Sequence, residues 1–509
     1  MKKLFVLIIC VLFILSPVIF ASCGEKNDGN KSGENQNNAI PPEDKVGPDG
    51  IEDAIPQEEI KLYPDLPDNL DFGGYKFRAL YSSVTEAGVW GLRDIVPNEE
   101  DEGEVINDAV IARNTYLEDK YNFELVGIPT TSSSMTSSSM KKIILAGSDE
   151  YDVLFVRQNQ TGDLITTGCL ADLNTVPYLD LSQPWWDQSI IDQLSVCNKS
   201  FAASGDIIST NTNAFRVVLF NKDMIAEYGL DSPYGLVRDN KWNLDNFYNM
   251  CKDISVDVNG DGIMNQHDQY GYLTQSGCTI NLYYATGQHM VVKDKDGIPS
   301  LTAGDEKTLQ ILSKINDILS TKDAVMLDQY YTGLDSRGPE YVLMTTFEDR
   351  RGLFFSEVLQ LAERMRATET EFGILPPPKA DENQSEYICF ADSYCVNLML
   401  IPVTNTNFER TGQILEALCA ESKYGLLPAY YDKTLKSKYS RDNDSEEMLD
   451  IIIKNKVVSL DEMFGWGMHS TIQDVLYKRT GEFTSAIDKN LTKAQAKLEK
   501  TINKIEELD

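Results

Sequence analysis

The protein has 509 residues, and 46 Lys and Arg against 79 Asp and Glu give it a formal net charge of −33 at pH 7. Hydrophobic residues make up 42% of the chain, which excludes a wholly disordered protein, and the length predicts two or three domains. The surplus of acid argues against nucleic acid and anionic lipid as electrostatic partners. We therefore expect no nucleic-acid partner, and a ligand that is neutral or cationic.

The first residues predict a secretory signal. A basic start and a continuous apolar run are followed by small residues before Cys23, a pattern typical of a lipoprotein signal peptide over residues 1–22. The sequence Phe20-Ala21-Ser22-Cys23 resembles a bacterial lipobox, in which Cys23 is lipidated, although Phe20 stands where Leu is usual. An uncleaved membrane anchor is the alternative. Either would hold the protein on the extracellular face of the cytoplasmic membrane.

Residues 23–69 predict a disordered tether between this anchor and the folded body. They are rich in Asn, Gly, Glu, Asp, Lys and Pro and show no apolar periodicity. A flexible chain of this length has an end-to-end distance of roughly 35–40 Å. The folded body would therefore stay close to the membrane.

The cysteines beyond the lipobox do not predict a disulfide framework. Their number is odd, their spacing is irregular and no Cys-x-x-Cys pair occurs. We expect buried free thiols, with a single bridge as the alternative in an extracellular protein. The seven positions are Cys169, Cys197, Cys251, Cys278, Cys389, Cys395 and Cys419.

The start of the folded body predicts alternating strands and helices. We expect strands at 76–81, 123–128 and 151–156, with helices at 104–121 and 140–145. This order is typical of a parallel sheet between helices. Ligands bind beyond the carboxyl ends of the strands in such sheets, so the loops after Tyr81 and Val156 are candidate walls of a cleft.

The remainder of the chain predicts a second α/β lobe. Two long apolar runs, 214–220 and 387–401, are expected as strands that cross between lobes, and helices are expected at 244–252, 305–319, 355–367, 408–420, 445–456 and 484–508. The fold class is therefore α/β, with two lobes, hinge-crossing segments and a cleft between the lobes. We divide the chain into a first lobe (70–213), a second lobe (214–345), a return to the first lobe and hinge (346–400), and a C-terminal helical part belonging mostly to the second lobe (401–509).

Residues 257–268 predict a structural Ca²⁺ site. Oxygen-bearing side chains stand at positions 1, 3, 5, 9 and 12 of a twelve-residue loop, with Gly262 at the sharp turn and a backbone carbonyl at position 7. The alternative is a polar turn with accidental spacing. Position 12 is Asp, as in dockerin loops, but a dockerin carries two such repeats and only one is present here. The predicted ligands are Asp257, Asn259, Asp261, Ile263, Asn265 and Asp268.

Motifs for catalysis are weak. The sequence contains no HExxH, GxSxG, P-loop or complete GxGxxG, and only three His. Pairs of carboxylates for glycoside hydrolysis remain possible, but 79 acidic residues make any one pair uninformative. We therefore expect no enzymatic activity.

Aromatic and polar residues in predicted loops are candidates for ligand binding. Aromatic faces stack on sugar C–H groups, while neighbouring polar groups bond the hydroxyls. The structural alternatives are core packing for the tryptophans, and capping or solvation for the polar residues. The aromatic candidates are Trp90, Trp186 and Trp466, and the polar candidates, which follow predicted strands, are Arg157, Asn159, Asn211 and Glu357.

Several short motifs, in this order, carry a family resemblance. They lie in residues 151–187, 220–271, 373–379 and 428–450. Together with the lipobox they resemble the clostridial type of extracellular solute-binding protein family 1, the substrate-binding lipoproteins of ABC importers. The resemblance implies a periplasmic-binding-protein-like fold that closes around a sugar or oligosaccharide, and a permease complex as partner.

Together these features predict a lipid-anchored, monomeric receptor. We expect it to capture a carbohydrate, an oligosaccharide, by hinged closure of its lobes and to deliver it to the membrane subunits of an ABC permease. The main alternative is an extracellular polysaccharide-degrading enzyme with a structural Ca²⁺. A surface adhesion module that binds a protein partner through the calcium loop is a third reading.

Overall fold

The computed structural model describes residues 61–508 apart from 83–90, 99–100, 102, 131–136, 322, 328–334, 336–337, 366–367, 434 and 436–441. The predicted signal peptide, Cys23 and Trp90 lie outside the described residues. The chain divides into a unit of residues 1–60 and a unit of residues 61–509, and only the second is described below. Within the described part, no helix is long and apolar enough to cross a membrane.

The last residues of the predicted tether belong to the folded unit. The Leu62 N–H donates to the Tyr424 hydroxyl at 2.7 Å, and Leu66 packs against the core of the first lobe. The boundary of the folded body therefore lies nearer residue 60 than residue 69.

A four-stranded sheet forms the first lobe, as the alternation of strands and helices predicts. Its strand order is β12-β3-β1-β2, with β1 parallel to both β2 and β3 and with β12 antiparallel to β3. The strands are β1 (Tyr75–Ser82), β2 (Phe123–Thr130), β3 (Val153–Arg157) and β12 (Asn397–Leu400). The surrounding helices are α2 (Val105–Tyr121), α3 (Ser137–Leu145), α4 (Thr161–Thr166), α5 (Gln188–Leu194), α13 (Phe408–Tyr424) and α14 (Leu426–Tyr430), with 3₁₀ turns η3 (Gln158–Gln160), η4 (Leu173–Thr175) and η5 (Asp206–Ala214).

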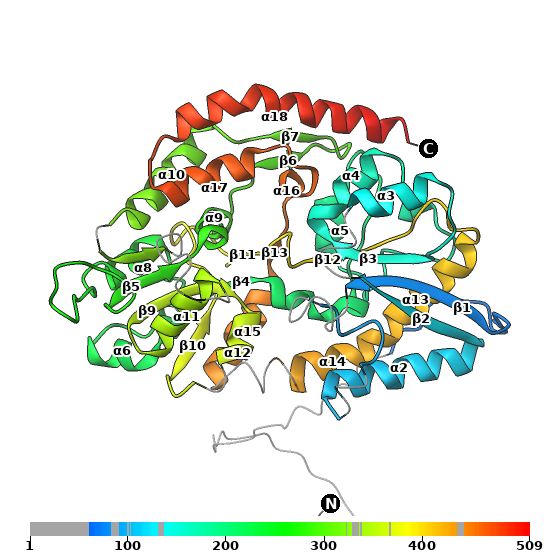
Figure 1. Cartoon of the computed structure of the whole chain (residues 1–509), viewed down its shortest axis with the longest axis horizontal. Helices are drawn as coiled ribbons and strands as arrows, with labels where there is room; N and C mark the ends of the chain where they lie inside the picture. Colours follow the sequence, from blue (N-terminus) through cyan, green and yellow to red (C-terminus); the bar gives the residue numbers. More distant parts are fainter. Residues whose placement is uncertain are drawn as a thin grey trace, which may run out of the picture. The chain divides into compact units, whose positions relative to one another are not determined.

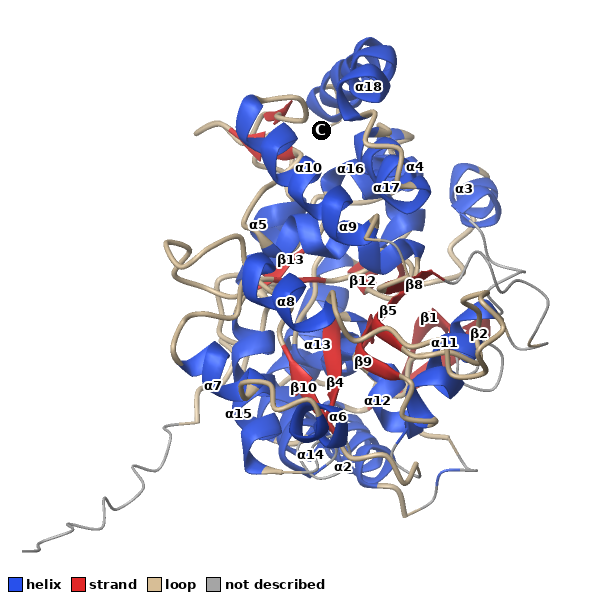
Figure 2. Cartoon of the chain, turned by 90° about the vertical axis from the view of Figure 1, so that its left-hand side faces the viewer, coloured by secondary structure: helices blue, strands red, loops and turns tan. Residues whose placement is uncertain are grey.

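A five-stranded mixed sheet forms the second lobe, with strand order β10-β4-β9-β5-β8 (Figures 1 and 2). Its strands are β4 (Arg216–Asn221), β5 (Tyr270–Thr274), β8 (Val325–Leu327), β9 (Gly352–Val358) and β10 (Phe372–Leu375). Its helices are α6 (Lys222–Glu227), α7 (Pro233–Arg238), α8 (Leu244–Cys251), α9 (Ser276–Ala285), α10 (Glu306–Leu319), α11 (Pro339–Glu348), α12 (Gln360–Arg364) and α15 (Asn443–Lys454).

The helix predicted at 355–367 is wrong in its first half. Seven consecutive residues, Gly352–Val358, are buried and form the strand β9, which lies between β4 and β5. A strand covered on both faces shows no alternation, so its apolar run resembles a buried helix. Since β9 and β10 belong to the second sheet, only the end of the segment 346–400 returns to the first lobe.

The chain crosses between the lobes at the two predicted runs, and it also crosses near residue 456. The first run forms β4, and the second forms the strands β11 (Cys389–Phe390) and β12. β11 pairs in parallel with β13 (Lys456–Val457), and this small sheet lies between the two main sheets in Figure 1. The seven cysteines between Cys169 and Cys419 are free thiols, of which five are buried as predicted and two, Cys197 and Cys395, are half-buried.

The C-terminal part belongs to both lobes rather than mostly to the second. α13 and α14 pack on the first lobe against α2 and η5, and α18 spans the two lobes (Figure 1). Near its end, the carbonyl of Ile505 accepts a hydrogen bond from Lys199 of the first lobe at 3.2 Å. The remaining elements are β6 (Val291–Lys293), β7 (Pro299–Leu301), α16 (Leu460–Phe464), α17 (Met468–Lys478) and α18 (Phe483–Glu506).

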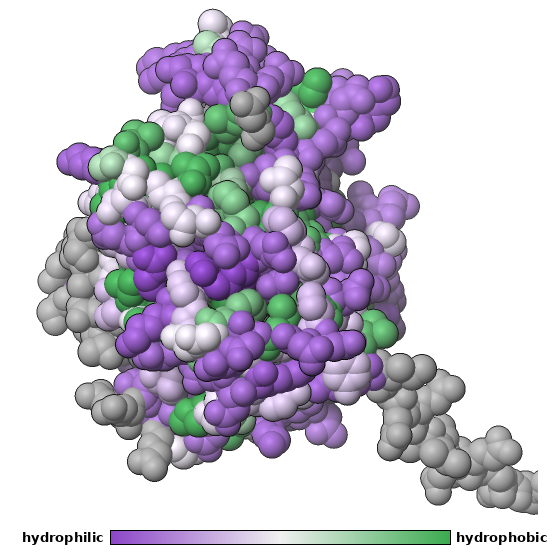
Figure 3. All heavy atoms as spheres, turned by 90° about the vertical axis from the view of Figure 1, so that its right-hand side faces the viewer, coloured by the Kyte–Doolittle hydropathy of each residue, from purple (hydrophilic) through white to green (hydrophobic). Residues whose placement is uncertain are grey.

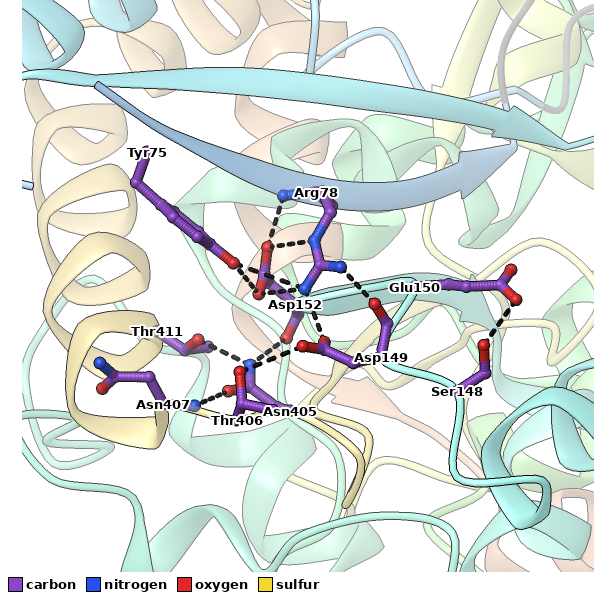
Figure 4. A network of polar contacts seen from close by, with 10 residues as sticks. All are labelled: Tyr75, Arg78, Ser148, Asp149, Glu150, Asp152, Asn405, Thr406, Asn407 and Thr411. Carbon is purple, nitrogen blue, oxygen red and sulfur yellow. Dashed lines mark hydrogen bonds and ion pairs between the residues drawn. The ribbon is translucent and has the colours of Figure 1, made fainter. Parts of the chain in front are cut away.

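One buried carboxylate joins two strands of the first lobe (Figure 4). Asp152 is 1% exposed and stands just before β3. It accepts hydrogen bonds from the backbone N–H of Arg78 at 2.7 Å, from the Arg78 guanidinium at 3.0 and 3.1 Å, and from the Tyr75 hydroxyl at 2.9 Å. The Asp152 carbonyl accepts from Asn405 at 3.0 Å, so the loop after β12 is held to the same point.

We expect Asp152→Ala to destabilise the folded unit by about 3 kcal/mol, because it removes the acceptor of the Tyr75 hydroxyl and of the Arg78 N–H, and leaves the partly buried Arg78 guanidinium with Asp149 as its acidic partner. Thermal denaturation of the folded body would measure this loss. The neighbouring Glu150→Ala, which removes a surface bond to Ser148, should change the stability by less than about 0.5 kcal/mol. Equal melting temperatures for the two variants would contradict the importance of the Asp152 network.

Candidate ligand-binding site

A cavity of about 610 Å³ is lined by residues of both lobes and of the hinge. Arg157, at the carboxyl end of β3, comes from the first lobe. The second lobe contributes the carboxyl ends of β5 and β9, at Gln275 and Glu357, and the helices α11 and α12. Asp392, Tyr394 and Cys395 come from the connection between β11 and β12. These strand ends are where the rule for open α/β sheets predicts a ligand, while most of the predicted wall after Tyr81, residues 83–90, lies outside the described residues.

A buried ion cluster forms the floor of the cavity. Arg216, 5% exposed, pairs with Glu357 at 2.8 Å and also with Asp392. Glu357 additionally accepts from the Val358 N–H at 2.9 Å, and Asp392 accepts from the Tyr394 N–H at 2.9 Å. The cluster therefore ties the second-lobe strands β4 and β9 to the hinge.

The two floor carboxyls differ in pKa. Burial raises the pKa of Glu357 above its ordinary value, and the charge of Arg216 only partly offsets this. Burial also acts on Asp392, but the Arg216 charge and hydrogen bond outweigh it and leave the pKa of Asp392 below its ordinary value. Gly277 makes the close packing possible, since a Cβ there would lie 2.5 Å from an Arg216 nitrogen.

The walls of the cavity carry aromatic and charged side chains. Tyr394 is 62% exposed although it stands on the hinge connection. Tyr341, on α11, accepts a hydrogen bond from Arg364, whose guanidinium carbon lies 5.5 Å from the ring centroid. Arg157 and Glu340 complete the charged wall.

Two of the polar candidates, Arg157 and Glu357, line the cavity, and their contact with a ligand stays a prediction. The other two do not line it. Asn159 lies on η3, where its N–H donates to the Ser393 carbonyl at 3.3 Å. Asn211 is buried, and its amide exchanges hydrogen bonds of 2.7 and 2.9 Å with the backbone of Asn397. Asn211 therefore supports β12.

The tryptophan candidates that the structure describes are core residues. Trp186 is 3% exposed and donates to Glu416 at 2.9 Å. Trp466 is 2% exposed, donates to Thr501 at 3.0 Å and stacks on Phe464. Both lie in loops, as predicted, but α13 and α18 cover them, so neither reaches the cavity.

Sequence reasoning missed the aromatic residues of the cavity, Tyr341 and Tyr394. One signal was available, since the polar Asp392 and Ser393 interrupt the apolar run of residues 387–401 just before Tyr394. A polar break in a hinge-crossing run indicates a point where the backbone leaves the sheet and faces solvent or a ligand.

The predicted calcium loop folds around its two end residues. The Asp257 carboxylate accepts from the N–H groups of Gly260 and Gly262, both at 2.7 Å. Asp268, which is fully buried, accepts from the N–H groups of Val258 and Asn265 at 2.9 and 2.8 Å. Among the described residues, no three His, Cys, Asp or Glu side chains are grouped so as to hold a metal ion. Calcium binding therefore stays a prediction.

A second group of buried titratable residues, Glu462 and His469, lies beside the floor of the cavity. Glu462 on α16 is 3.5 Å from the His469 ring, whose other nitrogen is 3.0 Å from the Tyr284 hydroxyl. Burial, reinforced by the negative charge of Asp392, raises the pKa of Glu462 to about 8. Burial lowers the pKa of His469 to about 4. Both side chains are therefore uncharged at neutral pH.

This arrangement predicts a pH-dependent stability. Because the folded protein keeps a proton on Glu462 that the unfolded chain releases, its free energy of unfolding falls as pH rises from about 4.5 to about 8. We expect Glu462→Gln to remove that loss, so the variant should match the wild type below pH 5 and exceed it increasingly up to pH 8.

Denaturation at a series of pH values measures this difference. Glu499→Gln, a substitution of an exposed residue on α18, serves as the control and should show no pH-dependent gap. A gap between Glu462→Gln and the wild type that stays constant across the series would contradict the assignment of the proton.

Comparison with known proteins identifies the fold. No family model and no curated protein matches the chain. The solved structures that resemble it include three with a TM-score of 0.53: the ABC substrate-binding protein Lmo0181 from Listeria monocytogenes in complex with cycloalternan, UspC of M. tuberculosis, and a cyclo/maltodextrin-binding protein complexed with maltotetraose.

The matches are long but distant in sequence. Identities are 11%, 12% and 12%, over 84%, 83% and 85% of this chain and 99%, 100% and 96% of the respective structures. They confirm the predicted two-lobed α/β architecture. The chain has the periplasmic-binding-protein-like fold that ABC substrate-binding proteins share.

Proposed function

We propose that the protein is an extracellular substrate-binding lipoprotein of an ABC importer, which captures an oligosaccharide by hinged closure of its lobes and delivers it to a membrane permease. The observation that carries this proposal is the cavity of about 610 Å³ between the lobes, with polar and aromatic side chains on its walls. This volume is within the usual range of small-molecule sites, about 300–1,000 Å³. The cycloalternan and maltotetraose bound by structural neighbours support a carbohydrate ligand.

The charge balance of the cavity favours a neutral ligand rich in hydroxyl groups. Three arginines and three acids line it, so their formal charges cancel. The arginines are Arg157, Arg216 and Arg364, and the acids are Glu340, Glu357 and Asp392. Sugar hydroxyls both donate and accept hydrogen bonds, and so can satisfy side chains of either sign, while the exposed ring of Tyr394 offers a face for sugar C–H groups.

The floor of the cavity argues for capture rather than hydrolysis. A glycosidase needs one carboxyl to protonate the leaving group and another to act as base or nucleophile. Here Glu357 and Asp392 both form ion pairs with Arg216. We therefore assign them a structural role rather than a catalytic one. The polysaccharide-degrading enzyme is therefore the weaker candidate.

The location of the protein follows from the sequence and is part of the proposal. Lipidation at Cys23 would anchor the chain on the outer face of the cytoplasmic membrane. The protein would deliver its ligand to the permease as a monomer. The face of the first lobe drawn in Figure 3 is largely hydrophilic, with hydrophobic residues in small patches, which suits a protein that works in water beside the membrane.

We also propose that residues 257–268 bind Ca²⁺ as a structural staple. The carboxylates of Asp257, Asp261 and Asp268 and the amides of Asn259 and Asn265 are the hard oxygen donors that Ca²⁺ prefers. The loop is tied to its surroundings, since the Tyr270 hydroxyl donates to the Asn265 carbonyl at 3.0 Å and Arg351 donates to the carbonyl of Gln266. A bound ion would therefore stiffen the link between α8 and β5.

The oligosaccharide proposal predicts a thermal shift with an unmodified sugar. Residues 61–509 would be screened against neutral mono- and oligosaccharides, and a ligand at 100 times its Kd should stabilise the protein by about 2.7 kcal/mol. Tyr394→Ala should weaken binding about tenfold, because it removes the exposed ring. Tyr116→Ala, at an exposed position on α2, is the control and should bind normally. Recovery of a degraded sugar would instead favour the enzyme.

The calcium proposal predicts that chelation lowers the melting temperature and that added Ca²⁺ restores it. Asp257→Asn should lower the melting temperature and abolish the response to Ca²⁺. Asp253→Asn makes the same charge change at an exposed position just before the loop, and should keep the response. A wild-type melting temperature that ignores both chelator and Ca²⁺ would refute the proposal.

A further inference from the structure

Most charged groups of the cavity already have protein partners. Arg216 is paired with Glu357 and Asp392, and Arg364 donates to the Tyr341 hydroxyl. The side chains of Arg157 and Glu340 differ from these. Neither makes a hydrogen bond or an ion pair with any residue in the part of the chain that the structure describes, and both are half-buried.

These two residues stand on opposite lobes. Arg157 is the last residue of β3, where its backbone is held in register with Asn397 of β12. Glu340 is in the first turn of α11, which begins at Pro339. Both backbones are therefore held by regular secondary structure, and both residues line the shared cavity.

A half-buried charge without a partner loses hydration that nothing in the protein replaces. A hydroxyl group can accept a hydrogen bond from a guanidinium and donate one to a carboxylate. A ligand with several hydroxyls can therefore satisfy both residues at once. Contacts with both lobes favour the closed state over the open one, which is the condition for ligand-driven closure.

We propose that Arg157 and Glu340 hold the ligand from opposite lobes, Arg157 as hydrogen-bond donor and Glu340 as acceptor, and that this pair couples ligand binding to closure. The proposal rests on the oligosaccharide-receptor function above and specifies which side chains read the hydroxyls. The competing arrangement is a direct ion pair between the two residues on closure, which would need no ligand.

Binding measurements on the folded body separate these cases. The wild type, Arg157→Gln, Glu340→Gln and the charge swap Arg157→Glu with Glu340→Arg would be titrated by calorimetry with neutral oligosaccharides, among them maltotetraose and cycloalternan. Each single substitution should weaken binding at least tenfold, and the swap should not restore it. Small-angle scattering should show compaction of the wild type only when the sugar is present.

Matched controls come from an exposed ion pair on the first lobe, Lys76 and Glu124, which are 3.2 Å apart. Lys76→Gln and Glu124→Gln make the same charge changes and should bind the sugar like the wild type. The melting temperature of each variant without sugar shows whether it is folded.

Four results would overturn the inference. Wild-type affinity in both single variants would show that neither side chain contacts the ligand, while the receptor function would stand. Recovery of affinity in the charge swap, or compaction of the wild type without sugar, would establish the direct ion pair. Absence of binding by the wild type to every oligosaccharide tested would instead refute the receptor function, and the inference with it.

Discussion

The cluster of Arg216, Glu357 and Asp392 is the interaction on which the rest of the molecule depends. A buried guanidinium is tolerated only when it is paired, and removal of one partner from such a pair typically costs about 3–5 kcal/mol. Arg216 begins β4, Glu357 lies near the end of β9, and Asp392 precedes β12 of the first-lobe sheet. The cluster therefore fixes the floor of the cavity at the point where the chain crosses between the lobes.

The first lobe could be predicted from the sequence because its order of strands and helices is local. The run 153–156 is short, apolar and bounded by Asp152 and Arg157, so its identity as a strand does not depend on distant contacts. β9 could not be recognised in the same way. Its seven buried residues form a strand only because β4 and β5, which precede it by many residues, flank it on both sides.

The residues of the candidate site divide in the same way, into those that the local sequence predicts and those that depend on distant parts of the chain. Arg157 and Glu357 were found because the strand-end rule depends on topology alone. Trp186 and Trp466 lie in the core because of residues far along the chain: Trp186 donates to the Glu416 carboxylate on α13, and Trp466 donates to the Thr501 hydroxyl on α18. Glu340 and Tyr394 were missed because their exposure to the cavity depends on how the lobes and hinge are arranged.

The charged groups on the floor of the cavity are ion-paired, whereas Arg157 and Glu340 on its wall are not. This difference has a thermodynamic consequence. A ligand shifts an equilibrium only by the difference between its interactions with the two states. The floor charges are satisfied by the protein, so they contribute little to that difference. Arg157, Glu340 and the exposed Tyr394 would gain partners in the proposed complex, so the free energy of ligand-driven closure should come from the wall rather than the floor.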